Sequence, residues 1–285
     1  MVISFEGRES CIQVYKEVWE DFRQRLSTGE YTYEQLENAK RHNFLKTLDD
    51  ALSYEENMST IEVNFSNLRL NYIFCRATKL KDEENSDNIH LSRFLPMSEY
   101  IKDDNRFSPK GVEYLYLGCK FGISPSSRKY VDIEKVCLKE IRSEKGDTVG
   151  ICNFEIPLFL HGKHIRDTNY KVIDLSPWDS YSFEDIEKEF NNLDDKLNDF
   201  KSNVNKLVFK LYMKILSSEL FKEVENVDNE KKYAPFHCLS YYFKSLGFQG
   251  IIYKSTLHDH NDVKNIVLFD KYYAKPISYR IIEVK

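Results

Sequence analysis

Apolar residues recur at helical spacing over the first part of the chain. Between residues 9 and 27 they fall three or four positions apart, which predicts an amphipathic helix that ends at Gly29. Thr32 and Gln35 have the spacing of a capping box and predict the start of a second helix. Its inward positions are Leu36, Ala39, Leu45, Leu48 and Leu52. Residues 1–58 are therefore predicted to form an N-terminal helical segment that supports the core.

The hydrophobic period changes to two near residue 61. Apolar and polar residues alternate at Ile61, Val63 and Phe65, and the alternation resumes at Leu68, Leu70, Tyr72 and Phe74, which predicts strands on both sides of residues 66–67. The next position on that apolar face is Arg76. A guanidinium there needs a bound anion or an internal carboxylate, unless the strand ends and the side chain reaches water.

A turn and a strand follow one another at residues 103–119. Pro109 and Gly111 are turn residues, and the run 114–117 consists of good strand formers. The turn carries Arg106 and Lys110 and is either an anion-holding loop or an ordinary solvated loop. A helix is predicted at about 131–144, with Glu134 and Glu140 on it, and a strand at 170–176.

Residues 182–222 show an apolar seam with steps of four and three. Ser182 and Asp185 are a plausible N-terminal cap, and the seam predicts about 40 residues of helix, about 60 Å long. Such a helix packs along the N-terminal helices, folds back as a hairpin, or pairs with a second chain to give a homodimer. Further along, the pattern predicts a helix at 234–247 and strands at 248–255 and 265–269.

Composition narrows the function classes. Apolar residues make up 41% of the 285 residues and charged residues 31%, with a net charge of −5, which argues against bulk binding to nucleic acid or to an anionic membrane. The six cysteines form no CxxC pair, and no signal peptide or membrane span is visible, so a cytoplasmic protein with free thiols is expected. The histidines of "HGKH" (161–164) and "HDH" (258–260) lack partners at ligand spacing, so no metal site is predicted.

Five segments in order resemble the RES domain family, which is named for its arginine, glutamate and serine. The segments are "FCRA" (74–77), "NRFSPKGVEYLYLG" (105–118), "LKEIR" (138–142), "GFQGIIYKS" (247–255) and "NIVLF" (265–269). The resemblance covers about residues 68–275 and is interrupted by the long helical segment. Asn105 stands where the family usually has glycine, and the loop before the helix that carries the glutamate is long.

The resemblance implies an α+β fold whose core is the split mixed sheet of ADP-ribosyltransferases. That core would occupy residues 59–285, with a helical insertion at about 180–232. The implied activity is cleavage of the nicotinamide–ribose bond of NAD by a phosphorylase or a glycohydrolase. The implied role is that of a bacterial toxin or defence effector that arrests growth by depleting NAD and is held in check by a helix-turn-helix antitoxin.

NAD is then the substrate, with inorganic phosphate as a possible co-substrate and no further cofactor. The alternatives are a protein ADP-ribosyltransferase, or a catalytically degenerate interaction protein that works through its long helix.

Each candidate residue suits a part of this chemistry. Arg76 is expected to hold the pyrophosphate, with Arg106 and Lys110 as lesser candidates. Glu140 is expected to stabilise positive charge on the ribose, and Glu134 is its competitor. Tyr116 would stack on the nicotinamide or form a hydrogen bond with the ribose, and the alternative is a core residue. Ser255 would form a hydrogen bond with a phosphate or with the carboxamide, and the alternative is a residue that caps a turn.

Overall fold

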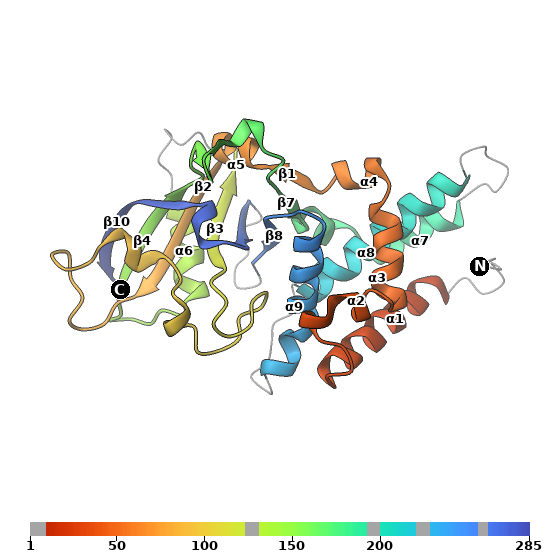
Figure 1. Cartoon of the computed structure of the whole chain (residues 1–285), viewed down its shortest axis with the longest axis horizontal. Coiled ribbons are helices and arrows are strands. Elements are labelled where there is room, and N and C mark those ends of the chain that lie inside the picture. Colours follow the sequence, from red (N-terminus) through yellow and green to blue (C-terminus); the bar gives the residue numbers. More distant parts are fainter. Residues whose placement is uncertain (1–9, 123–130, 193–199, 221–228, 256–261) are drawn as a thin grey trace. The chain divides into compact units, whose positions relative to one another are not determined.

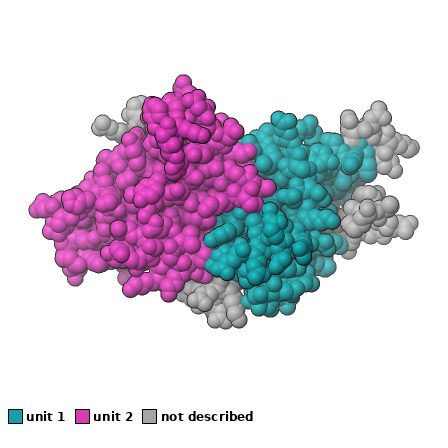
Figure 2. Space-filling model, viewed as in Figure 1, with its two compact units in different colours: residues 1–62, 175–242 teal, residues 63–174, 243–285 magenta. Residues whose placement is uncertain are grey.

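The computed structural model describes residues 10–122, 131–192, 200–220, 229–255 and 262–285. The chain has an α+β fold and divides into two compact units (Figure 2). Unit 1 comprises residues 1–62 and 175–242, and unit 2 comprises residues 63–174 and 243–285. The sequence analysis placed the helical insertion of about 180–232 in the domain that begins at residue 59, whereas in the structure this segment groups with the N-terminal helices.

Unit 1 is helical. Its elements are α1 (Ser10–Ser27), η1 (Tyr33–Gln35), α2 (Leu36–Ala39), α3 (Asn43–Leu52), α4 (Glu55–Ser59), η5 (Ser176–Ser180), α7 (Phe183–Asn191), α8 (Phe200–Leu220) and most of α9 (Asn229–Ser245) (Figure 1). The predicted first helix is confirmed, and the hydroxyl of Thr32 accepts a hydrogen bond from the Gln35 amide as the capping pattern predicted. The predicted second helix is instead divided among η1, α2 and α3.

The apolar seam of residues 182–222 belongs to a helical hairpin. Of the arrangements predicted for this segment, the hairpin is confirmed, because α7 ends at Asn191, α8 begins at Phe200, and the two helices pack against each other. Their polar sides are joined by an ion pair of 2.6 Å between Lys210 and Glu189. The seam residues Ile186, Leu207 and Leu211 are buried within this chain. A homodimer formed through this segment stays a prediction.

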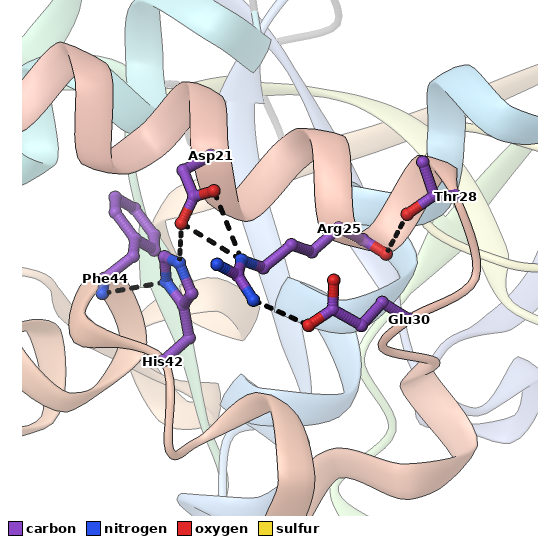
Figure 3. Close-up of polar contacts among 6 residues, drawn as sticks. All are labelled: Asp21, Arg25, Thr28, Glu30, His42 and Phe44. Carbon is purple, nitrogen blue, oxygen red and sulfur yellow. Dashed lines mark hydrogen bonds and ion pairs between the residues drawn. The ribbon is translucent and has the colours of Figure 1, made fainter.

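A histidine caps helix α3 (Figure 3). Nδ1 of His42 accepts from the Phe44 amide at 3.1 Å, and Nε2 lies 2.8 Å from a carboxylate oxygen of Asp21 on α1. The hydrogen bond from His42 lowers the pKa of Asp21, and Arg25 lowers it further against the effect of burial. The buried imidazole therefore joins the start of α3 to the side of α1.

Unit 2 is built on a mixed sheet with the strand order β1-β7-β8-β9-β3-β2-β4-β10. The β7–β8 pair is parallel, whereas β8–β9, β9–β3, β3–β2, β2–β4 and β4–β10 are antiparallel. The strands are β1 (Glu62–Asn64), β2 (Tyr72–Lys79), β3 (Leu115–Phe121), β4 (Thr148–Glu155), β7 (Lys171–Asp174), β8 (Gly250–Lys254), β9 (Val263–Leu268) and β10 (Lys275–Glu283).

Shorter elements complete unit 2. They are α5 (Phe65–Asn71), η2 (Leu91–Phe94), η3 (Ser98–Tyr100), α6 (Val131–Glu140), the β5–β6 hairpin (Phe159–Leu160 and Lys163–His164), η4 (Ile165–Asp167) and η6 (Lys271–Tyr273). The strand predicted through Leu68 and Leu70 is wrong, because Asn64 caps α5 by accepting from the Asn67 amide and residues 65–71 are helical. The predicted strands near 114, 170, 250 and 265 are confirmed.

Side chains from opposite faces of the sheet enter two different clusters. One face carries Phe74, Leu117 and Cys152 and packs with Phe94 of η2. The other face carries Cys75 and Ile151 and packs under Ile133, Val136 and Cys137 of α6. Gly118 of β3 lies beneath this helix, where an added Cβ would stand 2.8 Å from Sγ of Cys137. The close approach of α6 to the sheet therefore depends on the missing side chain at 118.

The hydrogen-bonded ladder between β2 and β3 ends partway along both strands. It runs from Tyr72–Phe121 to Cys75–Gly118. Beyond that point β2 continues only along β4, as far as Lys79, while β3 continues along β9 as far as Leu115. Arg76 of β2 and Tyr116 of β3 lie just past the end of the shared ladder.

We predict that His42→Ala destabilises unit 1 by roughly 1–3 kcal/mol, because it removes a helix cap and a buried ring that contacts Phe22. The measurement is the urea midpoint of unfolding followed by circular dichroism. His164→Ala is the control, since His164 caps only the three-residue η4 in the same way, and it should change the midpoint far less. Equal shifts for both variants would contradict the assigned role of His42.

Candidate functional site

Glu140 is the last residue of α6, and its carboxylate lies against two strands of the sheet. The helix ends here, short of the predicted 144, because Arg142 adopts a positive φ of 48° and its amide turns back to the Lys139 carbonyl. Oε1 of Glu140 accepts a hydrogen bond from the hydroxyl of Ser255, which follows β8. The same oxygen accepts from Nδ2 of Asn265 on β9, at 2.7 Å.

Glu134, the competing carboxylate, has a different partner. Its Oε2 lies 2.5 Å from the guanidinium of Arg280 on the edge strand β10. Glu134 therefore joins α6 to the sheet edge, whereas Glu140 meets Ser255. This geometry favours Glu140 over Glu134 as the carboxylate of the candidate site.

The turn before β3 is closed by main-chain hydrogen bonds between Asn105 and Ser108 in both directions, at 2.9 and 3.3 Å. Side-chain oxygen Oδ1 of Asp104 accepts from the Lys110 amide at 2.8 Å. The Lys110 side chain is exposed, whereas Arg106 is half-buried. Of the two cations predicted in this turn, Arg106 is the one held next to the strand.

The hydroxyl of Tyr116 ties this turn to β3. It accepts from the Phe107 amide at 3.1 Å and lies 3.0 Å from the hydroxyl of Ser108. Burial raises the pKa of Tyr116, while these hydrogen bonds and the charge of Arg106 act in the opposite direction. Tyr116 is thus an ordered part of the turn rather than an isolated core ring.

Tyr253 on β8 lies within electrostatic range of both Tyr116 and Glu140. Burial raises its pKa, the negative charge of Glu140 raises it further, and the charge of Arg106 lowers it. The ring is buried and lies 5.0 Å from the ring of Phe107 between centroids. The two-residue period of the strand predicts that Tyr253 shares a face with Ser255, but it gives Tyr253 no role in the site.

Arg76 has an electrostatic environment that does not suit a cation. One terminal nitrogen donates to the Phe94 carbonyl at 3.0 Å, and none of the described carboxylates forms an ion pair with it. Burial lowers the pKa of Arg76 to about 10, and the nearby charge of Arg93 adds to this effect. The hydroxyl of Tyr116 raises the pKa of Arg76 slightly, so it lies within electrostatic range of the guanidinium.

The structure thus brings some of the predicted residues together and leaves Arg76 apart from Glu140. Directly paired residues share a face, so Arg76 lies with its partner Cys152 on the face packed by Phe94. Asn265 pairs with Gly118 and Tyr253, on the face covered by α6, where Glu140 lies. Tyr116 belongs to the face of Gly118, so Arg76 and Tyr116 stand on opposite faces just past the end of the β2–β3 ladder.

The histidine segments show ordinary structural roles where they are described. Nδ1 of His164 accepts from the Arg166 amide, and the ring of His161 contacts Tyr170 and Tyr273. His258 and His260 lie outside the described residues. Across the described part of the chain, no three histidine, cysteine, aspartate or glutamate side chains are grouped so that they could hold a metal ion.

Comparisons with known proteins give little further information. No family model matches the chain, and no curated protein matches it. Among solved structures, the chain is similar to the crystal structure of the M. tuberculosis MbcT–MbcA toxin–antitoxin complex, with 10% identity and a TM-score of 0.34 over 83% of this chain and 94% of that one. That similarity is too low to establish a common fold or function. Within the described ranges, no helix is both long and apolar enough to cross a membrane.

We predict that Arg76→Met leaves unit 2 at least as stable as the wild type, by 0 to about 2 kcal/mol in the free energy of unfolding. A pKa lowered from 12.5 to about 10 corresponds to roughly 3 kcal/mol by which the fold disfavours the charged form, and the lost hydrogen bond to Phe94 offsets part of it. Denaturant unfolding measures the change. Arg69→Met is the control, because Arg69 also donates to a main-chain carbonyl, that of Ile156, and its loss should destabilise. A loss in Arg76→Met as large as in the control would overturn this account.

Proposed function

We propose that unit 2 binds NAD and cleaves the bond between nicotinamide and ribose. The observation that carries this proposal is the hydrogen bond between Ser255 and Glu140, which are 115 residues apart in the chain. The resemblance to RES domains put these two residues in one site from sequence motifs alone. Their direct contact supports that resemblance at the point where the chemistry would occur.

In this proposal NAD lies across the end of the β2–β3 ladder. Its diphosphate would take Arg76, whose guanidinium donates to a main-chain carbonyl and has no carboxylate partner among the described residues. Its nicotinamide ribose lies on the other side, next to Glu140. Arg76 and Glu140 belong to opposite faces of the sheet, so one ligand could reach both only where two neighbouring strands separate. Strands β2 and β3 separate at the end of their shared ladder.

The chemistry places modest demands on the protein. Nicotinamide leaves the ribose as a neutral molecule, so the reaction needs no general acid at the leaving group. The ribose carbon becomes positively charged as the bond breaks, and the carboxylate of Glu140 would stabilise that charge and accept a hydrogen bond from a ribose hydroxyl. Tyr116 would present its ring to the nicotinamide, and Arg106 would add positive potential near the phosphates.

The acceptor of the ADP-ribosyl group decides the type of enzyme. Phosphate makes a phosphorylase, water a glycohydrolase, and a protein side chain a transferase. We favour the first two, because phosphate and water need no docking surface beyond the NAD site itself. The proposed role is that of a toxin controlled by a cognate antitoxin of the helix-turn-helix type, as the resemblance implies.

Replacement of the carboxylate tests the enzymatic proposal. Glu140→Gln should lower the rate of nicotinamide release from NAD by roughly 100-fold or more, because the amide cannot stabilise developing positive charge. Glu134→Gln removes a carboxylate from the same helix and breaks the ion pair with Arg280, yet should keep the rate within about twofold. The assay follows NAD and nicotinamide by chromatography, with and without phosphate. Intact NAD in the presence of wild-type protein would reject the proposal.

Expression in cells separates the enzymatic reading from the alternative of an interaction protein. We expect wild-type protein to arrest growth as cellular NAD falls, and Glu140→Gln to do neither, because both effects require bond cleavage. Growth rate and NAD content are measured together, with equal protein amounts checked by immunoblot. Arrest by Glu140→Gln with normal NAD would favour a binding function of the helical unit.

A further inference from the structure

Both hydrogen bonds to Glu140 end on the same carboxylate oxygen. Ser255 and Asn265 donate to Oε1, and no described residue donates to Oε2. A carboxylate held by two donors at one oxygen has a fixed plane and a fixed direction for its second oxygen. The geometry therefore distinguishes a supported oxygen from one that is left for another partner.

We infer that Asn265 is a positioning residue, which orients Glu140 so that Oε2 faces the nicotinamide ribose. This inference rests on the proposed function. Under it, Oε2 accepts the hydrogen bond from a ribose hydroxyl, and Asn265 contacts no atom of NAD. Its contribution reaches the reaction only through the carboxylate.

The placement of Asn265 suits a fixed support. Its side chain is 6% exposed, and its strand β9 is paired on both sides, with Gly118 across from it on β3 and Tyr253 across from it on β8. An amide on a doubly paired central strand has little freedom to move. Glu140, by contrast, is the last residue of a helix and is exposed, so its own backbone does not fix its carboxylate.

The position of Glu140 on its helix adds an electrostatic reason for this support. The carbonyl end of a helix is its negative end, which disfavours a carboxylate there. Two donors at Oε1 offset that repulsion and hold the side chain over the sheet. Without Asn265, the hydrogen bond from Ser255 is the one that remains at Oε1. The carboxylate can then rotate about that hydrogen bond, and the direction of Oε2 is no longer fixed.

The test is steady-state NAD cleavage by Asn265→Leu, which removes the donor and keeps the branching and the number of heavy atoms of the side chain. We expect kcat to fall about ten- to hundredfold, which is the change in rate that corresponds to the free energy of one charge-assisted hydrogen bond. KM for NAD should stay within about twofold of the wild-type value. Asn153→Leu is the matched control, since Asn153 lies in the same sheet and donates to Ser278, and its kinetics should be unchanged. Circular dichroism and thermal unfolding confirm that both variants are folded.

A double variant separates positioning from a general structural effect. In the Glu140→Gln background, Asn265→Leu should change the residual rate by less than about twofold, because the carboxylate through which Asn265 acts is already gone. An independent, multiplied loss in the double variant would overturn the inference. So would a raised KM with unchanged kcat, full activity of Asn265→Leu, or an equal loss in Asn153→Leu. Each of these results requires an active wild-type enzyme, so each differs from failure of the proposed function, which leaves NAD intact in the wild-type assay.

Discussion

Unit 2 depends on a row of cross-strand neighbours formed by Cys75, Gly118, Asn265 and Tyr253. These residues come from β2, β3, β9 and β8 and pair one after another across the centre of the sheet, on the face that α6 covers. The register decides which side chains lie under the helix, since a slip of one residue would turn each of them to the other face. It puts an amide under the end of α6 and a glycine under its middle. The site is therefore a product of strand register more than of any single loop.

The same row of residues marks the point where β2 and β3 stop pairing with each other. The ladder between β2 and β3 closes at Cys75 and Gly118, and the two strands then follow different neighbours. Arg76, which has no carboxylate partner among the described residues, stands on one strand just past this point, and the ordered Tyr116 stands on the other. Burying such a charge is costly, and under the proposed function the diphosphate of NAD would offset that cost. Unit 1 shows no such cost at His42, whose two ring nitrogens both have partners.

How much was predictable from the sequence differs between the site and the fold. Motif order was enough to predict that Ser255 and Glu140 belong together, but it could not show that Arg76 faces away from them, because facing depends on the register of strands distant in sequence. Residues 65–71 were misread because over seven residues the apolar positions fit either period, and the cap at Asn64 decides for helix. The seam of α7 and α8 was read correctly as apolar, yet periodicity alone does not reveal where a helix reverses. Asn265 opens the NIVLF segment, but that segment predicted only a buried strand, and the role of the amide depends on the register that brings it beneath Glu140.

Gly118 has a consequence for how this protein would diverge among its descendants. The helix that carries Glu140 rests on a position without a side chain, so a single added methyl group there would press on Cys137 and lift the helix. If the proposed function holds, a descendant could lose its activity in this way while every polar residue of the site stayed in place. The arginine, glutamate and serine alone would then count such a descendant as active, and residue 118 would distinguish an active copy from an inactive one.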